Sequence, residues 1–367
     1  MSEQKTFNLN NIIGYLIIIF IAAIIIPSYL STFVNKDKNN CKKISKFDII
    51  KPNDIKTYDE YLKDSENEYY KIKDFYIKTA YNCFCSGDFK NDYVNSCALA
   101  NCYKNGVRAL DIQIFSLDGE PIIAANSLNT NYYKETFNYI TFEEGIREIN
   151  NIYKLTNNTK RNSDPIFLIL RLHYDSIYNE NKDVNYIDEK KMIFYNKIYE
   201  ILNNEFPNTG EDSFTNNYFF NNYSNQDKSI PNISIDKAKY KIFLFVILNE
   251  GELNSTDTEL LKSSNLANIT DDYGNDSDGF NYDRYNSYLN SDKYSTRVLT
   301  KNNLHYCMPN LGPNNYNFNF TDPLSRGIQF IGMNFQNNDK YLKEYNDYFQ
   351  ENSNGLSFVK KIDDFIM

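Results

Sequence analysis

RGIQFIGMNFQNNDKYLKEYNDYFQENSNGLSFVKK, residues 326–361, carries more information about the fold than any other part of this 367-residue chain. Its first part, residues 328–335, is a short and almost uninterrupted apolar run, as expected for a strand buried on both faces. A polar break, an amphipathic helical pattern, a glycine turn and a final apolar run follow. A buried strand followed directly by a helix is typical of α/β barrels.

The same alternation of strand and helix recurs earlier in the chain. Apolar runs predict strands at residues 75–80, 109–115, 121–125, 166–174 and 240–248. Helical spacing follows at Phe142, Ile146, Ile149 and Tyr153, and again from residue 188 to 206. Because such strands imply a parallel sheet that right-handed crossovers can close, we predict a single (β/α)8 TIM-type barrel over residues 71–367.

Residues 249–292 differ in composition, since Asp, Asn, Ser and Gly dominate them. Such a segment buries little apolar surface, so we expect a mobile acidic insertion in the barrel. Its carboxylates at Asp271, Asp272, Asp276 and Asp278 lack the spacing and the terminal Glu of an EF-hand loop. A calcium site in the insertion is therefore the less favoured interpretation.

The N-terminal region contains an uncharged apolar run at residues 12–34. A helix of this length spans the hydrocarbon core of a bilayer, which is about 30 Å thick. We predict a tail (residues 1–11), a transmembrane anchor (12–34) and a polar stalk (35–70). A cleaved signal peptide is less favoured, because the run is long and no small-residue cleavage site follows clearly.

The sequence leaves the membrane side of the large domain open. Lysines after the apolar run favour the cytosol, whereas several N-x-S/T sequons favour a lumenal or external position. The net charge of -9, with no other basic cluster, argues against nucleic acid as a partner. The lysines beside the span are expected to contact anionic lipid head groups. Abundant Asn, Lys, Ile and Tyr suggest an AT-biased genome, such as that of a large DNA virus or a low-GC microbe.

The six cysteines are Cys41, Cys83, Cys85, Cys97, Cys102 and Cys307. Their even number allows one or two disulfides, but a chain of this size does not need a disulfide framework. Buried thiols and local disulfides are therefore equally weighted. A zinc site is disfavoured because no C-x2-C pair and no nearby histidine is present.

Several motifs make the chain resemble phosphoinositide-specific phospholipase C of the eukaryotic type, with its X and Y barrel halves. In the closing segment they are Gly327, Gln329 and Asn334 to Gln336. Further matches are G-x-R-x-L at Gly106, Arg108 and Leu110, D-G-E-P at residues 118–121, P-I-F-L-I-L from Pro165, residues 231–241, and T-R-V at 296–298. The resemblance covers roughly residues 75–363 and implies a phosphodiesterase fold that acts on inositol phospholipids.

The resemblance also implies a degenerate active site. The two family histidines, which stabilise the phosphorane and protonate the leaving group, fall on Tyr81 and Ala125. The calcium-ligand positions read Asn82, Asp111 and Gln113, and a further ligand carboxylate falls on Arg171. Metal binding at Asn82 and Asp111 is therefore expected to be weak or absent, and Arg171 is free to pair with Asp111. The sequence thus implies that this chain has no cofactor, although calcium is the cofactor of the family.

For substrate contacts, Arg297 matches a family arginine and Leu299 replaces the tyrosine that stacks on inositol. The two histidines of the chain, His173 and His305, match structural or exposed positions. We therefore expect a membrane-anchored phospholipase C-like protein without catalysis, which binds lipid or phosphate or serves as a structural protein of a membrane or a virion. The alternative is an active phosphoric diester hydrolase with a rearranged site built from Tyr81, Asp111, Arg171 and Arg297. The oligomeric state is left open.

Overall fold

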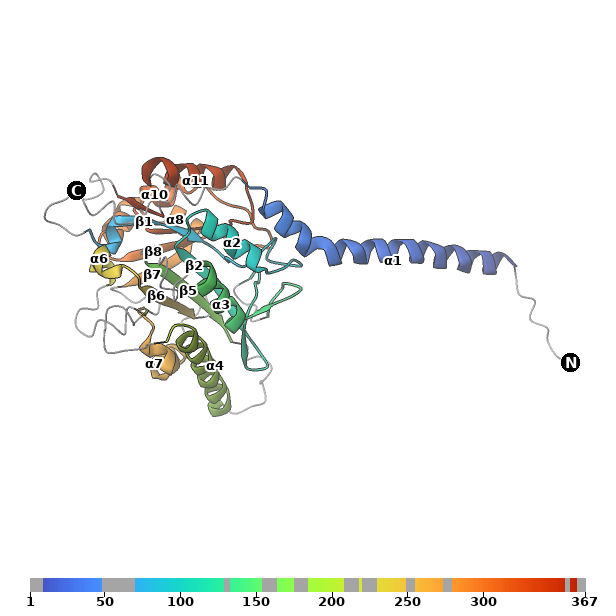
Figure 1. Ribbon diagram of the computed structural model, residues 1–367, viewed down its shortest axis with the longest axis horizontal. Helices are drawn as coiled ribbons and strands as arrows, with labels where there is room; N and C mark the ends of the chain where they lie inside the picture. Colours follow the sequence, from blue (N-terminus) through green and yellow to red (C-terminus); the bar gives the residue numbers. More distant parts are fainter. Residues whose placement is uncertain are drawn as a thin grey trace.

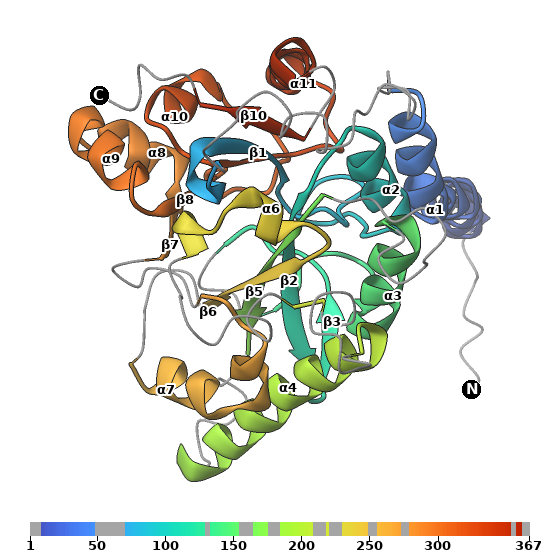
Figure 2. The same cartoon turned by 60° about the vertical axis from the view of Figure 1, so that its left-hand side comes forward.

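A curled β-sheet with helices on its outer side forms the body of the protein, and one long helix extends away from it (Figures 1 and 2). The computed structural model describes residues 9–47, 70–128, 133–153, 164–174, 184–207, 218–219, 230–248, 255–272, 279–353 and 357–361. The remaining residues are not discussed. The architecture is a mixed α/β fold of the barrel type.

Four parallel strands lie side by side and form one part of the curled sheet, which we call the first arc. They are β1 (Phe75–Ala80), β2 (Ala109–Leu117), β5 (Ile166–His173) and β6 (Ile242–Leu248). β1 pairs with β2, β2 with β5, and β5 with β6, all in parallel. Their side chains are buried on both faces, except at the end of β2, which confirms the strands predicted from the apolar runs.

The second arc consists of β7 (Phe280–Arg284), β8 (Leu304–Met308) and β9 (Phe330–Met333). β7 pairs with β8 and β8 with β9, and β9 returns to β1, again in parallel. The closing apolar run is therefore the strand that joins the last part of the chain to the first, as its burial on both faces predicted.

The two arcs meet between β6 and β7 through a single residue, Asp272. Its carbonyl oxygen accepts a hydrogen bond from Val246 N at 3.0 Å, and its Oδ2 accepts one from Phe280 N at 3.0 Å. A Cβ on Gly279 would lie 1.6 Å from the Asp272 Oδ2 atom, so only glycine fits there. Among the described residues, a one-residue bridge to Phe245 thus replaces one full strand of the expected eight-stranded barrel.

Short antiparallel strands extend the sheet at two places. β3 (Glu120–Ile123) pairs with β2 and β4 (Ile140–Thr141) pairs with β3. β10 (Phe358–Lys360) pairs with β1. The predicted strand at residues 121–125 is therefore part of a hairpin rather than of the parallel sheet, because a two-residue turn at Asp118 and Gly119, both with positive φ, returns the chain at once.

Helices cover the outside of the sheet (Figure 2). They are α2 (Ser96–Lys104), α3 (Phe142–Tyr153), α4 (Val184–Glu205), α6 (Ile235–Ala238), α7 (Ser255–Ser263), α8 (Tyr285–Asn290), α9 (Lys293–Thr300), α10 (Thr321–Ser325) and α11 (Lys340–Ser353), with short 3-10 helices η3 (Ile72–Asp74), η5 (Ile230–Asn232) and η6 (Asn265–Asn268). The predicted helical face of α3 is buried, as its spacing indicated.

Aromatic rings fill the interior of the curled sheet. Phe245 stacks on Phe280 with ring centroids 4.2 Å apart, and Phe167 lies 5.3 Å from Phe330. These contacts connect the two arcs where hydrogen bonding between them is sparse. They also correct the expectation that residues 249–292 form an insertion outside the core, since β7 lies within that range and Phe280 is fully buried.

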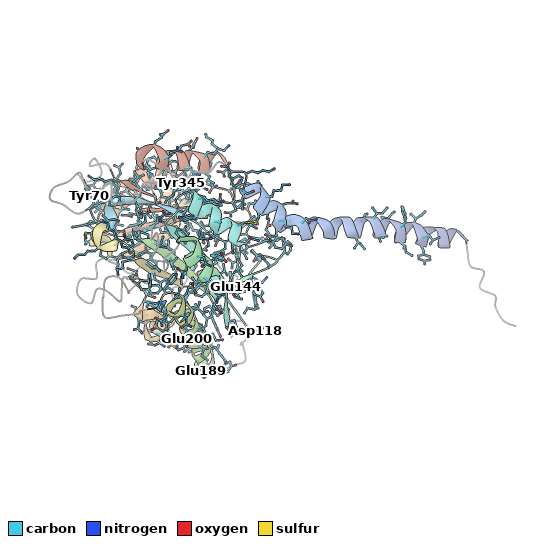
Figure 3. All side chains as sticks on the ribbon, viewed as in Figure 1. Tyr70, Asp118, Glu144, Glu189, Glu200 and Tyr345 are labelled. Carbon is cyan, nitrogen blue, oxygen red and sulfur yellow. A yellow bond between two sulfur atoms is a disulfide. The ribbon has the colours of Figure 1, made fainter. Side chains whose placement is uncertain are left out.

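α1 (Leu9–Ile44) is a single helix of 36 residues that projects from the body (Figure 1). The expected membrane anchor at residues 12–34 is not supported: within the described residues, no helix combines the length and the apolar character needed to cross a membrane. The side chains at 9–13 and 27–34 lie outside the described part. In Figure 3 the side chains drawn along residues 14–26 project into open space.

The predicted polar stalk at residues 35–70 is also corrected in its first part. Residues 35–44 continue α1, and Ile44 at the end of the helix is buried against the body. A disulfide joins Cys41 to Cys97 in α2, 56 residues apart, so the disulfide that is present is not one of the local bridges expected from the sequence. The other four cysteines are buried free thiols. Residues 48–69 of the predicted stalk lie outside the described residues.

Candidate functional site

The candidate site lies at the carboxyl ends of the first strands, where α/β barrels carry their active sites. Asp111 and Gln113 come from β2, and Arg171 and His173 come from β5, which pairs with β2 along its whole length. Tyr81 and Asn82 follow directly after β1. The parallel register therefore brings together residues that lie 60 and more positions apart in the sequence.

A buried ion pair between Arg171 and Asp111 forms the centre of the site. Arg171 Nε donates to Asp111 Oδ2 at 2.8 Å, and Arg171 Nη2 donates to Asp111 Oδ1 at 2.7 Å. Both side chains have an exposed fraction of 0%. The two parallel hydrogen bonds are the bidentate geometry in which a guanidinium binds a carboxylate most strongly. The pairing that the sequence suggested is thus present.

Residues around the pair satisfy the remaining donors and acceptors. Arg171 also donates to Tyr81 Oη at 3.1 Å and to Asn82 Oδ1 at 2.6 Å. Asp111 Oδ2 accepts a further hydrogen bond from Tyr306 Oη at 3.0 Å, and Asp111 Oδ1 accepts one from Asn82 N at 3.1 Å. Asn82 adopts a positive φ of 46°, a conformation that asparagine tolerates better than most residues.

Tyr81 lies between two guanidinium groups. Its ring is 4.3 Å from Arg171 Cζ and 5.6 Å from Arg284 Cζ, both within cation–π range. Arg284 Nη1 donates to Tyr81 Oη at 3.0 Å and to the carbonyl of Pro309 at 2.7 Å. Tyr81 is 4% exposed, so the position predicted to replace a family histidine is a packed ring rather than an accessible group.

The electrostatics of the site favour permanently charged Arg171 and neutral tyrosines. Burial opposes the charge of Arg171, but the Asp111 carboxylate outweighs it and raises the pKa of the guanidinium above its usual value. Burial, reinforced by the negative charge of Asp111, raises the pKa of Tyr306 well above its usual value. Arg171 is therefore charged and Tyr306 neutral over the whole physiological pH range.

A second cluster surrounds Gln113 and His173. Gln113 Nε2 donates to Asn126 Oδ1 at 2.8 Å and lies 3.3 Å from His173 Nε2, while Asn126 N donates to Gln113 Oε1 at 3.1 Å. The His173 ring stacks on Phe115. Burial, with the positive charges of Arg171 and Arg284, lowers the pKa of His173 to about 3. Ala125, the other position predicted to replace a family histidine, is fully buried and directly precedes Asn126 of this cluster in the sequence.

The predicted metal ligands already hold a cation of the protein itself. Arg171 Nη2 contacts both Asn82 Oδ1 and Asp111 Oδ1, the oxygens that a calcium ion would need. No group of three or more His, Cys, Asp or Glu side chains that could hold a metal ion occurs among the described residues. The residues at this position do not fit calcium.

Two predicted substrate residues, Arg297 and Leu299, do not join the site. Both lie on α9, which precedes β8, and Arg297 Nε donates to the carbonyl of Ser325, just before β9. They are therefore at the amino ends of the parallel strands, opposite to Arg171, and Leu299 is 51% exposed. The expectation that they line the same site is not met, because the T-R-V match falls on a helix.

Two further residues of the site, Tyr306 and Arg284, were missed from the sequence. Arg284 is the last residue of β7, inside the range interpreted as an insertion, and Tyr306 is in β8, which was not predicted. The alternation of Phe280 and Tyr282, and the run Leu304 to Met308, were the available signals. His305, expected in an exposed loop, is 5% exposed in β8.

The acidic residues of the predicted insertion have structural contacts where they are described. Asp271 Oδ2 accepts a hydrogen bond from Leu244 N at 2.8 Å, and Asp272 bridges β6 and β7 as stated above. Asp276 and Asp278 lie outside the described residues.

Comparisons with known proteins identify the fold and no family. No known family profile matches the chain. A probable cytosol aminopeptidase of Wigglesworthia glossinidia brevipalpis is 27% identical over 215 residues, which cover 50% of this chain and 42% of that protein. The chain thus spans less than half the length of that relative.

Solved structures give a likeness over most of the chain. PLC21 of L. pealei and PLC21 of S. officinalis each match with a TM-score of 0.56 and 13% sequence identity, covering 82% of this chain and 38% of theirs. A calcium-dependent phosphoinositol-specific phospholipase C from a Pseudomonas sp. matches with a TM-score of 0.45 and 8% identity, over 79% of this chain and 95% of that one. At such identity the first two matches establish a phospholipase C-like fold with a curled half-barrel sheet.

Proposed function

We propose that this chain is a phospholipase C-fold protein without phosphodiesterase activity, which acts through binding or as a structural component. The observation that carries the proposal is the Arg171 to Asp111 ion pair, which is completely buried and bonded on all sides at the strand ends. An enzyme of this fold needs space there for a phosphodiester and its ring. Here Tyr81 and the ion pair occupy that space.

Loss of proton transfer supports the same proposal. Cleavage of a phosphodiester by a neighbouring hydroxyl needs a base and an acid that titrate near the working pH. Tyr81 is buried between two arginines, and Ala125 has no ionisable group. His173 is 1% exposed, and its pKa of about 3, lowered by burial first, keeps it neutral. No described residue at the strand ends combines access with a suitable pKa.

We further propose that the site binds no calcium. A guanidinium already neutralises Asp111 and contacts Asn82 Oδ1, so a metal ion would have to displace a permanent cation from a buried carboxylate. The alternative of an active enzyme with a rearranged site is disfavoured for a related reason. Tyr81, Asp111 and Arg171 are bonded to one another, and Arg297 is at the other end of the sheet.

The partner proposed is a membrane lipid with an anionic head group, such as an inositol phospholipid. The likeness to phospholipase C structures supports this class of ligand. Because Arg171 is fully neutralised, we place such binding on the outer surface of the protein rather than at the buried pair.

The test is turnover of phosphatidylinositol by the full chain, with calcium and with chelator. We expect no turnover above the uncatalysed rate in either condition. The full chain is required, because Cys41 in α1 is bonded to Cys97 in the body. Calcium-dependent turnover that Asp111→Asn abolishes, while exposed Glu144→Gln preserves it, would contradict the proposal. Sedimentation with vesicles of phosphatidylcholine, with and without phosphatidylinositol, tests lipid binding separately.

A further inference from the structure

The C-terminal end of α1, residues 36–44, is attached to the segment that connects β1 to α2. We call these two parts the docking segment (residues 36–44) and the 84–95 segment. Lys36 Nζ lies 2.9 Å from Asp92 Oδ2 and donates to the carbonyl of Asn91. Asn40 Nδ2 donates to Asp92 Oδ1 at 2.7 Å, and Asn95 Nδ2 donates to Asp37 Oδ2 at 2.9 Å. The Cys41 to Cys97 disulfide links the same two regions covalently.

Asp92 also organises the 84–95 segment itself. Its carboxylate accepts hydrogen bonds from Asp88 N at 3.1 Å and from Tyr93 N at 3.0 Å, and its carbonyl accepts one from Phe137 N at 2.8 Å. Asp92 is 3% exposed although it is charged, so most of its hydrogen-bonding capacity is used inside this contact. One carboxylate therefore takes part both in the contacts of the docking segment and in the internal order of the 84–95 segment.

The 84–95 segment in turn covers the strand-end site. Phe89 packs edge-on against Tyr81 with ring centroids 5.6 Å apart, and Phe89 N donates to the carbonyl of Pro313. Phe89 is 3% exposed and Tyr81 is 4% exposed. Tyr81 accepts hydrogen bonds from Arg171 and Arg284. A continuous set of contacts thus leads from α1, through Asp92 and Phe89, to the ring that lies over Arg171.

We propose that the docking segment keeps the strand-end site closed, and that the redox state of its disulfide controls this closure. While the Cys41 to Cys97 disulfide is intact, α1 holds the 84–95 segment over Tyr81; when the disulfide is reduced, the segment opens more often. This inference rests on the closed site proposed above and adds its regulation. The contacts that remain after reduction involve partly exposed side chains, and such contacts contribute little each.

The chemistry requires a dithiol reductant, which supplies two electrons. One of its thiolates attacks the sulfur of Cys41 or Cys97, the bond between the two cysteines breaks, and a mixed disulfide forms. The second thiol of the reductant then displaces the protein sulfur. The reductant leaves as a disulfide, and Cys41 and Cys97 each end as a protonated thiol. Both cysteines are partly exposed, so a reductant can reach them.

Buried thiols report on the opening. Cys85 lies in the 84–95 segment, where it pairs with Val94 and where Cys85 N donates to Asn82 O at 2.9 Å. It is 2% exposed, and burial raises the pKa of its thiol well above the usual value, so it reacts slowly in the closed state. Cys307 in β8 is equally buried and lies outside this segment, so it reports on unfolding of the whole sheet.

The experiment is native alkylation of the full chain, followed by mass spectrometry of each cysteine, before and after reduction with a dithiol. We expect the alkylation rate of Cys85 to rise at least about tenfold on reduction, since loss of a disulfide is typically a loss of a few kcal/mol of local stability. Cys307 should stay unreactive. Alkylation of Cys41 and Cys97 alone would overturn the proposal, as would equal rates at Cys85 and Cys307.

Two variants sharpen the result. The double variant Cys41→Ser and Cys97→Ser should show fast Cys85 alkylation without any reductant. Lys36→Gln keeps the disulfide and should change the rate by less than about threefold, because a partly exposed ion pair is weak. Fast alkylation in Lys36→Gln alone would overturn the role of the disulfide. Phosphatidylinositol turnover measured on the same oxidised sample tests the proposed function independently of these rates.

Discussion

Two arginine–aspartate pairs connect β2 with β5 toward opposite ends of β5, and their comparison explains much of this protein. At the carboxyl ends, Asp111 of β2 pairs with Arg171 of β5. At the amino ends, Arg108 directly before β2 pairs with Asp164 before β5, with Arg108 Nε 2.9 Å from Asp164 Oδ2. Both pairs are fully buried. The charges are exchanged between the strands, and the geometry differs: Arg171 binds Asp111 through two parallel hydrogen bonds, whereas one hydrogen bond, from Nε, joins Arg108 to Asp164.

The surroundings of the two pairs are alike. The Arg108 guanidinium lies 5.8 Å from the rings of Tyr103 and Tyr153, and Arg171 lies 4.3 Å from the ring of Tyr81. In barrel enzymes the amino ends of the strands serve stability and the carboxyl ends serve catalysis. In this chain both pairs are fully buried beside tyrosine rings. The pair near the carboxyl end of β5 is thus buried like a structural ion pair.

The largest effect is expected when either arginine is removed. Arg171→Ala and Arg108→Ala should each lower the free energy of unfolding by about 3–5 kcal/mol, because each leaves a buried carboxylate without its partner. Urea denaturation measures both. The double variant Arg171→Met with Asp111→Leu should recover most of the loss, since no charge is left buried. A loss below about 1 kcal/mol for Arg171→Ala alone would mean that the two ends differ.

A smaller effect is expected at Lys78, in β1 beside Arg108. Lys78 is fully buried, and its Nζ makes no hydrogen bond to any described residue. Burial lowers its pKa to about 7. Because the unfolded chain keeps the usual higher pKa, it binds more protons between pH 7 and 9, so stability should rise with pH there.

Lys78→Met should therefore stabilise the protein at pH 7, by an amount on the order of 3 kcal/mol, and should flatten the rise of stability between pH 7 and 9. Denaturation at three pH values measures this. Lys343→Met, at an exposed position of α11, is the matched control and should leave the pH dependence intact. If the stability of the wild-type protein did not depend on pH between 7 and 9, this expectation would be contradicted. Lys78 would then not distinguish the amino ends of the strands from the carboxyl ends.

The smallest effect is expected from removing one hydroxyl at each end. Tyr81→Phe leaves Arg171 and Arg284 without a shared acceptor and should cost about 1–3 kcal/mol, as hydrogen bonds to charged groups do. Tyr153→Phe removes a hydrogen bond of 3.0 Å to the carbonyl of Val107 and should cost only about 0.5–1.5 kcal/mol. Thermal denaturation compares them. Equal losses would show that the hydroxyl of Tyr81 does not stabilise the arginines.

The sequence predicted the first arc well and the second arc poorly, for physical reasons. Strands buried on both faces, such as β5 and β6, are visible as apolar runs. β7 is only partly buried and lies in a polar region, so its strand state depends on β8 and on the stacking of Phe280 against Phe245. No local pattern contains that information.

For the candidate site, the pairing of Arg171 with Asp111 followed from motif residues, whereas the assignment of Tyr81 and Ala125 to family histidine positions stays a prediction. The contributions of Tyr306 and Arg284 depended on β7 and β8 and were therefore missed. The attachment of α1 to the body of the protein was also not predicted from the sequence. The spacing of Cys41 and Cys97, 56 residues apart, does not indicate a pairing until α1 is known to continue to residue 44.

The one-residue bridge at Asp272 has a consequence for the order of folding. The first arc pairs strands that follow one another along the chain, apart from the hairpin of β3 and β4, and the second arc does the same. Each arc can therefore form from contacts that are near in sequence, at a modest loop-closure cost. Joining them requires β1 to meet β9 and Asp272, which lies just before β7, to meet Phe245 of β6. The protein is thus expected to assemble as two half-sheets, with the ring completed in the final step.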